Sequence, residues 1–235
     1  MMMTTRTGHD FSSDGQQHSG FRGRTTVQTI KDFVTFPIRA VTLFDVDKWG
    51  LTALSSERFY YVSREVLGYC LDVGCGKNNR FIERFLNGNG RGIDVFRYEG
   101  LTEEHLVEDI TQFPFADCSF DTVTFIANLN HVSKFKRDIE LSEAHRCLRP
   151  GGNLIVTMGN PLAELLVHGV VFLYDKLFGT NFDMDTERGM EEGEEYYLTT
   201  SEIQCRIERA GFRDIRKKYF VTQWGLNHLF VAWRP

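Results

Sequence analysis

Short apolar runs alternate with segments of helical spacing along the middle of the chain. The runs of strand length lie at 69–73, 91–96, 106–109, 120–126 and 153–158. Helical spacing appears over 81–86, where four apolar side chains share a face, and again over 134–148. Strands that alternate with helices predict βαβ units, and therefore a mostly parallel sheet with right-handed crossovers.

The end of the chain predicts a different connection. Thr199 and Glu202 fit a capping box, and Gly211 fits the stop of the helix that they begin. Two strands follow at about 215–222 and 228–233, joined by the short stretch WGLN. A connection of this length makes a hairpin and no crossover, so we expect the last two strands to be antiparallel.

The N-terminal part is predicted to begin with a tail and continue with helices. Residues 1–24 are rich in Ser, Gly, Gln and Thr, which favours disorder. Apolar residues then share a helical face until Pro37 interrupts the pattern; they are Val27, Ile30, Phe33 and Val34. A second helix is expected over 56–67, with a serine as its N-cap and Gly68 as its stop.

Residues 161–195 leave the strand–helix rhythm. The stretch 162–178 is apolar with helical spacing, and 180–195 is polar and acidic. We interpret 161–195 as a cap inserted into a core formed by 68–160 and 196–235. The apolar stretch contains two acids, a lysine and a histidine, so it predicts no transmembrane helix.

Composition narrows the class of protein. A chain of 235 residues with 42% hydrophobic and 25% charged residues suits one soluble core with a small cap. The net charge of −5 argues against a general nucleic-acid binder, and we expect no DNA partner. The five cysteines form no CxxC pair, which suits a reducing cytoplasm, and no signal peptide is visible.

The stretch LDVGCGKNN at 71–79 predicts a nucleotide-binding turn after the first strand. It lacks the Ser or Thr of a P-loop, and Asn79 stands where a dinucleotide fold has its third glycine. Asp72 would also place a negative charge beside a pyrophosphate. S-adenosylmethionine has no phosphate but carries a sulfonium and an ammonium, so Asp72 favours it.

Two further acids support a nucleoside with no phosphate. Asp94 lies at the end of the second strand, where a carboxylate can accept both ribose hydroxyls. Asp109 ends the third strand, where it can accept from the adenine amino group while Ile110 packs on the ring. Asp94 alone does not distinguish this cofactor from NAD.

Four motifs in order resemble those of the class I S-adenosylmethionine-dependent methyltransferases: LDVGCG, GIDVF, EDITQFPFADCSFDTVTFIANLNHV and RCLRPGGNLIV. The group that they resemble most is the small-molecule enzymes that include those of quinone biosynthesis. The resemblance covers about 68–158 and 198–234. It implies a Rossmann-like, doubly wound α/β fold with a seven-stranded sheet ending in an antiparallel hairpin, plus a helical cap. Asn78 departs from the pattern, because many members have a third glycine there.

The resemblance also implies roles for individual residues. The methionine portion would lie on Asp72 and the glycine turn, the ribose at Asp94, the adenine at Asp109 and Ile110, and the sulfonium near Ile126. The segment 25–67 would cover the cofactor. No metal site is expected. The candidate cofactor-binding residues are Asp72, Gly74, Cys75, Gly76, Asp94, Val95, Asp109, Ile110 and Ile126.

Catalysis is expected to be an in-line displacement on a small-molecule acceptor. His131 is the candidate base and Asn128, like Asn130, a candidate to orient the acceptor; a structural role is the alternative for each. Tyr60 and Tyr61 are candidates to cover the cofactor or simply to pack. The cap would roof a bulky or apolar acceptor.

Two other functions stay open. An RNA or protein methyltransferase would show a basic patch, for which the candidates are Lys134, Lys136, Arg137, Arg213, Arg216, Lys217 and Lys218. A non-catalytic module would bind S-adenosylmethionine without turnover. The sequence does not predict the oligomeric state.

Overall fold

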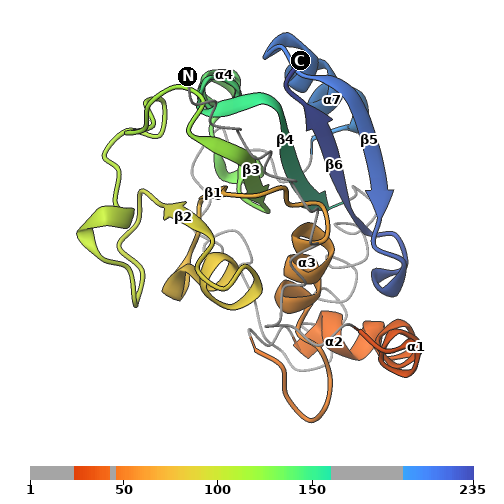
Figure 1. Cartoon of the computed structure of the whole chain (residues 1–235). Coiled ribbons are helices and arrows are strands. Elements are labelled where there is room, and N and C mark those ends of the chain that lie inside the picture. Colours follow the sequence, from red (N-terminus) through yellow and green to blue (C-terminus); the bar gives the residue numbers. More distant parts are fainter. Residues whose placement is uncertain (1–23, 43–45, 160–197) are drawn as a thin grey trace, which may run out of the picture.

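The computed structural model describes residues 24–42, 46–159 and 198–235 (Figure 1). The predicted tail and the predicted cap at 161–195 therefore lie outside the described residues, apart from Arg24 at the end of the tail. The apolar stretch at 162–178, from which we expected a bulky or apolar acceptor, lies outside them too.

A central mixed sheet carries the fold. Its strand order is β2-β1-β3-β4-β6-β5. The first four of these pair in parallel, and β6 pairs antiparallel with both β4 and β5. The antiparallel pair of β5 and β6 confirms the predicted hairpin. The bounds are β1 Cys70–Val73, β2 Gly90–Ile93, β3 Phe120–Ile126, β4 Leu148–Gly159, β5 Arg213–Tyr219 and β6 Asn227–Trp233.

The sheet has six strands within the described residues, where we expected seven. The expected third strand at 106–109 forms one parallel bridge, between Asp94 and Leu106. The Asp94 N–H donates to the His105 carbonyl, and the Val107 N–H donates to the Asp94 carbonyl. Asp109 then turns the chain away by accepting the Thr111 N–H. A carboxylate that accepts from the backbone two residues on favours a turn over a longer strand.

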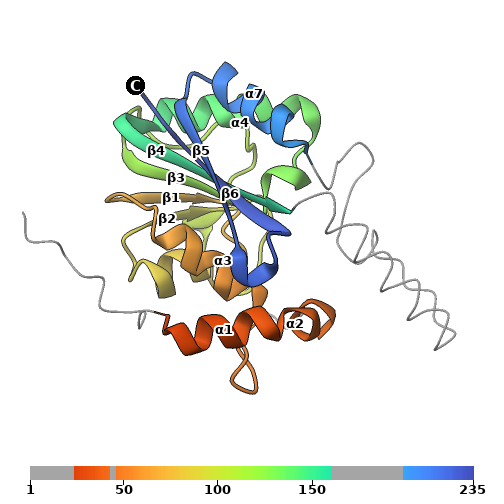
Figure 2. The ribbon, with the colours of Figure 1, turned by 90° about the vertical axis from the view of Figure 1, so that its right-hand side faces the viewer.

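Helices cover both faces of the sheet, which makes the fold doubly wound (Figure 2). One face packs against α4 and α7, and the other against α3 and η2. The bounds of the helices are α1 Thr26–Val34, α2 Phe36–Thr42, α3 Leu54–Ser63, η1 Lys77–Asn79, η2 Phe81–Phe85, η3 Glu103–His105, η4 Leu129–His131, α4 Lys134–Cys147, α7 Thr200–Arg209 and η5 Val221–Gln223.

Some of the predicted helix boundaries agree with the structure and others do not. The Thr199 hydroxyl accepts the Glu202 N–H at 3.2 Å, so α7 begins at the predicted cap. The predicted interruption of the first helix lies at Thr35, two residues before Pro37, and Pro37 itself lies in the first turn of α2. The prediction that a serine caps the N-terminus of α3 is wrong. Its N-cap is Ala53, whose N–H donates to the Asp47 carboxylate at 2.8 Å.

The N-terminal helices α1 and α2 lie at one end of the molecule, on the side of α3 remote from the sheet (Figure 2). The apolar face of α1 is exposed, whereas its acidic residue Asp32 is buried. This is the reverse of an ordinary surface helix, which buries its apolar stripe.

Candidate functional site

The glycine turn is fastened to the end of β2. The N–H groups of Gly74 and Cys75 donate to the Ile93 carbonyl at 2.8 and 3.1 Å. Gly74 and Gly76 have φ of +75° and +63°, a left-handed backbone that glycine adopts without strain. The backbone therefore turns at the carboxyl ends of β1 and β2, where open α/β sheets bind their ligands.

Asn128 packs directly over Gly74. A Cβ added to Gly74 would lie 2.3 Å from the Asn128 side-chain carbon, and Asn128 donates to the Val73 carbonyl at 3.1 Å. Ala127 directs the chain there with a left-handed φ of +52°, while its N–H donates to the Thr157 hydroxyl. Asn128 thus contacts the glycine turn itself, a contact that the sequence did not predict.

The departure at Asn78 has a structural reason. Asn78 has a φ of +59°, the conformation for which other family members use glycine and which asparagine tolerates. Its N–H donates to the Glu99 carbonyl, and its side chain fills the space beside Gly100, where a Cβ would lie 2.1 Å from Oδ1. The turn is therefore complete without the third glycine.

Asp72 is buried in the middle of the sheet and accepts a 2.7 Å hydrogen bond from the Thr124 hydroxyl. The pKa of Asp72 is raised to about 7, chiefly by burial and also by the nearby charge of Asp94, while the Thr124 hydrogen bond lowers it. A cation bound beside Asp72 would favour its ionised form and bring that pKa down again. Burial also raises the pKa of the neighbouring Cys75 thiol far above its ordinary value.

Asp94 is held by two backbone donors. Its Oδ2 accepts the Gly76 N–H at 3.0 Å and its Oδ1 accepts the Phe96 N–H at 2.9 Å. Because each carboxylate oxygen can accept a further hydrogen bond, both stay available to a pair of hydroxyls. The turn and the acid therefore hold each other in place.

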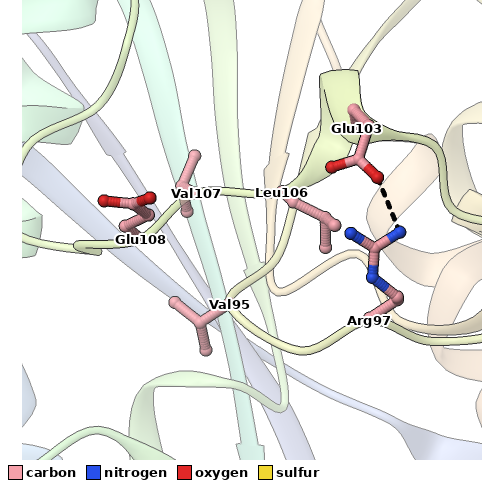
Figure 3. Close-up of a pocket in the computed structure, with 6 residues that line it drawn as sticks. All are labelled: Val95, Arg97, Glu103, Leu106, Val107 and Glu108. Carbon is pink, nitrogen blue, oxygen red and sulfur yellow. Dashed lines mark ion pairs between the residues drawn. The ribbon is translucent and has the colours of Figure 1, made fainter.

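A pocket of about 370 Å³ lies next to Asp94 along the chain, and Val95 is one of its walls (Figure 3). Leu106 and Val107 form another part, and the exposed ion pair between Arg97 and Glu103 closes one end. Glu108 lies at the end away from this ion pair (Figure 3). Val95, a candidate cofactor-binding residue, is thus accessible.

Asp109 and Ile110 differ in exposure. Asp109 is exposed, and its Oδ1 accepts from both the N–H and the hydroxyl of Thr111, at 2.9 and 2.7 Å. These hydrogen bonds lower the pKa of Asp109. Ile110 is half-buried and packs against the core cluster of the α4 face.

The candidates for the acceptor side lie on η4 and α3. His131 is exposed on η4, and its N–H donates to the Asn128 carbonyl at 2.8 Å. Ile126 is buried on the α3 face of the sheet. Tyr61 stacks on Phe220 with ring centroids 4.4 Å apart, so its ring is used in packing.

Arg137 fixes η4 from inside the protein. Its Nε donates to the Leu129 carbonyl at 3.0 Å and its Nη2 to the Asn130 carbonyl at 3.2 Å. The side chain is fully buried, which corrects its place among the candidates for a basic surface patch. This role could not be predicted from the sequence. The start of α4 is rich in lysine and arginine, and the sequence alone does not show which of these side chains is buried.

The basic residues of β5 are engaged as well. Lys217 donates to the Thr200 hydroxyl, Lys218 pairs with Glu65 at 2.6 Å, and Arg216 lies over the Trp233 ring. Among the described residues, no group of three or more His, Cys, Asp and Glu side chains is placed to hold a metal ion. No helix in those ranges is long and apolar enough to cross a bilayer.

Comparisons with known proteins indicate what the domain and the fold are similar to. Residues 71–156 match the family model of the methyltransferase domain. A ubiquinone/menaquinone biosynthesis C-methyltransferase of Dinoroseobacter shibae is 30% identical over 139 residues, which are 55% of this chain and 52% of that protein. The chain spans about half the length of the curated relatives it matches.

Solved structures share the fold. A S-adenosylmethionine-dependent methyltransferase of Methanosarcina mazei aligns with a TM-score of 0.51 and 21% identity, over 74% of this chain and 96% of the other. Another from Thermotoga maritima aligns with a TM-score of 0.56 and 16% identity, over 88% and 99%. Residues 71–156 are therefore similar to a methyltransferase domain, and the described residues have the fold of S-adenosylmethionine-dependent methyltransferases.

Proposed function

We propose that the chain transfers the methyl group of S-adenosylmethionine to a small-molecule acceptor by in-line displacement. One observation carries the cofactor part of the proposal: two buried carboxylates, Asp72 and Asp94, flank the glycine turn, and within the described residues neither has a cationic partner. Such a turn would repel a pyrophosphate and attract a ligand with an ammonium and a sulfonium.

The residues of the turn would each bind one part of the cofactor, which supplies the activated methyl group. Asp72 would accept from the ammonium, with Gly74 and Gly76 giving the backbone close access to the methionine portion. Asp94 would accept the ribose hydroxyls, and Val95 would pack beside the nucleoside. Asp109 and Ile110 would hold the adenine, and Ile126 would lie near the sulfonium.

The acceptor part rests on the relatives and on η4. The D. shibae relative is a C-methyltransferase of ubiquinone and menaquinone biosynthesis, which favours a quinol or another small aromatic acceptor. Since η4 follows β3 at the carboxyl edge of the sheet, His131 would face the acceptor and take its proton, while Asn128 would keep the glycine turn in place beside it. The protein otherwise positions the acceptor and excludes water.

Calorimetry tests the cofactor site. S-Adenosylmethionine and its demethylated product should both bind, and Asp94→Asn should weaken binding at least about tenfold through the loss of charged hydrogen bonds. Glu104→Gln is the matched control, because this exposed acid lies close by and contacts only Arg91 among the described ion pairs. Unchanged affinity in Asp94→Asn would contradict the assigned site.

Turnover tests the acceptor. Release of the demethylated product should depend on an added quinol or phenol and not on RNA. Cofactor binding without turnover on such a panel would favour a non-catalytic binding module, and salt-sensitive turnover on RNA would favour a nucleic-acid enzyme.

A further inference from the structure

Helix α1 turns its apolar residues toward solvent. Val27 is 76% exposed, Ile30 60% and Val34 67%. At 100° per residue these side chains share one face, and Gln28 and Asp32 lie on the opposite one. A surface helix of an isolated globular protein shows the reverse arrangement.

Buried ion pairs hold α1 in this orientation. Asp32 pairs with Arg24 and accepts from the Gln28 amide at 2.9 Å. Arg39 pairs with Glu57 of α3 at 2.9 Å and donates to the Asp32 carbonyl at 2.5 Å. Rotating α1 to bury its apolar residues would expose or break this network, and a buried charge without its partner is strongly destabilising. The outward apolar face is therefore part of the folded structure.

The exposed apolar surface continues onto two neighbouring segments. Trp224, beside η5, donates its indole N–H to the Phe33 carbonyl at 2.9 Å. Trp49 is 81% exposed at the tip of the turn 48–51, and the Lys31 ammonium of α1 donates to the Gly50 carbonyl of that turn at 2.5 Å. We name this surface the N-terminal apolar face: Val27, Ile30, Phe33, Val34, Ile38, Trp49, Val221 and Trp224.

The charge around this face is distinctive in an acidic protein. The chain has a net charge of −5, yet the only acid from residue 24 to 42 is Asp32, which is buried. Residues 220–227 carry no charge. Two exposed lysines, Lys31 and Lys48, lie on the segments that form the face, and one exposed acid, Asp47, lies beside Lys48. Cations thus outnumber exposed acids on these segments, and the helices α1 and α2 carry no exposed acid, which complements an anionic, partly apolar partner.

We propose that the N-terminal apolar face docks on the surface of an anionic lipid bilayer. Aliphatic residues of an amphipathic helix insert at the level of the headgroups, and tryptophans prefer that boundary because their rings are apolar with one polar N–H. In both ribbon views α1, α2 and the turn after α2 project at one end of the molecule, and in Figure 2 that end is opposite α4 and α7. A projecting helix and a turn tip suit a fluid surface better than a rigid second copy.

Vesicle flotation tests the proposal. The full chain should float with vesicles of phosphatidylcholine mixed with phosphatidylglycerol, less with phosphatidylcholine alone, and less at high salt. Ile30→Ser with Val34→Ser should reduce binding by about tenfold or more, because two apolar side chains no longer enter the bilayer. Phe135→Ser on α4 is the matched control, since this residue is 87% exposed on the other end of the molecule.

Three results would contradict the bilayer proposal, and each can be told apart from the others. Circular dichroism of both variants should match the parent chain, since the replaced side chains are exposed. Failure of the parent chain to float, or equal binding by the double variant, would overturn the proposal. Sedimentation showing a dimer that the double variant dissociates would assign the face to a second copy and would also overturn it.

Discussion

The Thr124 hydroxyl on β3 donates to the Asp72 carboxylate on β1 at 2.7 Å, inside the sheet and directly below the glycine turn. This hydrogen bond lowers the pKa of Asp72, against burial and Asp94, which raise it to about 7. The charge of the proposed ammonium-binding acid thus depends on one hydroxyl and on pH near neutrality.

Thr124→Val should weaken cofactor binding and shift its pH dependence. In the parent chain affinity should rise with pH through about 7, because binding needs the ionised Asp72. Without the hydroxyl the pKa of Asp72 goes up, so the midpoint of the affinity profile should move to higher pH. Calorimetry over a pH series measures this. Thr122→Val is the control, since the Thr122 hydroxyl contacts Asn153 and the Leu67 backbone and no residue of the turn; an equal shift there would contradict the assignment.

Gly74→Ala should damage the cofactor site for two reasons that separate variants can resolve. Its Cβ would collide with Asn128, and its φ of +75° is unfavourable for alanine by about 1 kcal/mol. Adding Asn128→Ala should recover part of the lost affinity by removing the collision. Gly88→Ala has the same backbone penalty at φ +76° with open space around it, so it should leave cofactor affinity unchanged. A double variant no better than Gly74→Ala would refute the steric account.

Glu140 on α4 should destabilise the protein at alkaline pH. The side chain is fully buried, and neither of its oxygens has a hydrogen-bond partner in the described part of the chain. Burial raises the pKa of Glu140 from 4.5 to about 8, so the folded state keeps a proton that the unfolded state releases. The free energy of unfolding should therefore fall as pH rises from about 4.5 to 8.

Glu140→Gln should remove the part of this fall that Glu140 causes and leave the part that Asp72 causes; at alkaline pH it should be more stable than the parent chain by an amount on the order of a few kcal/mol. Urea unfolding at several pH values measures the difference. Glu104→Gln, at an exposed site, should keep the slope of the parent chain. Parallel pH profiles for Glu140→Gln and the parent would show that Glu140 is not a proton-binding group in this range.

Arg137→Lys should lower kcat while the affinity for S-adenosylmethionine stays unchanged. Arg137 donates to two carbonyls of η4, and lysine cannot span both with the same geometry. The turn that carries His131 would then move, whereas Asp72 and Asp94 would not. Steady-state kinetics with calorimetry separates the two effects, and Lys136→Met, an exposed neighbour, is the control. Loss of cofactor affinity with unchanged kcat would mean that Arg137 acts elsewhere.

The regular parts of the fold could be predicted because local pattern and tertiary burial agree there. The strand at 120–126 has the predicted bounds, and Thr199 caps α7 as its hydroxyl and spacing indicated. The expected strand at 106–109 fails because Asp109 uses its side chain in a turn with Thr111, a local choice that competes with strand pairing.

The positions of the acids in the candidate site could be predicted from the sequence, but the packing around the glycine turn could not. The spacing of Asp72, Gly76 and Asp94 places them together, and the structure joins the last two by a hydrogen bond. The contact of Asn128 with Gly74 depends on the left-handed Ala127, which no propensity would assign to alanine. The exposure of the apolar face of α1 could not be predicted either. The spacing of the apolar residues shows that they share one face of the helix, but it does not show whether that face contacts the protein or the solvent.

In the sheet that the described residues form, β5 is an outer strand, and it carries Arg213, Arg216, Lys217 and Lys218. A border strand offers unpaired backbone groups that a second chain can extend, and positive side chains on it repel a like strand. Arg213 and Arg216, which form no ion pair among the described residues, should therefore oppose edge-to-edge aggregation. Neutralising both should favour fibrous or amorphous assemblies at high protein concentration, even where the isolated fold is unharmed.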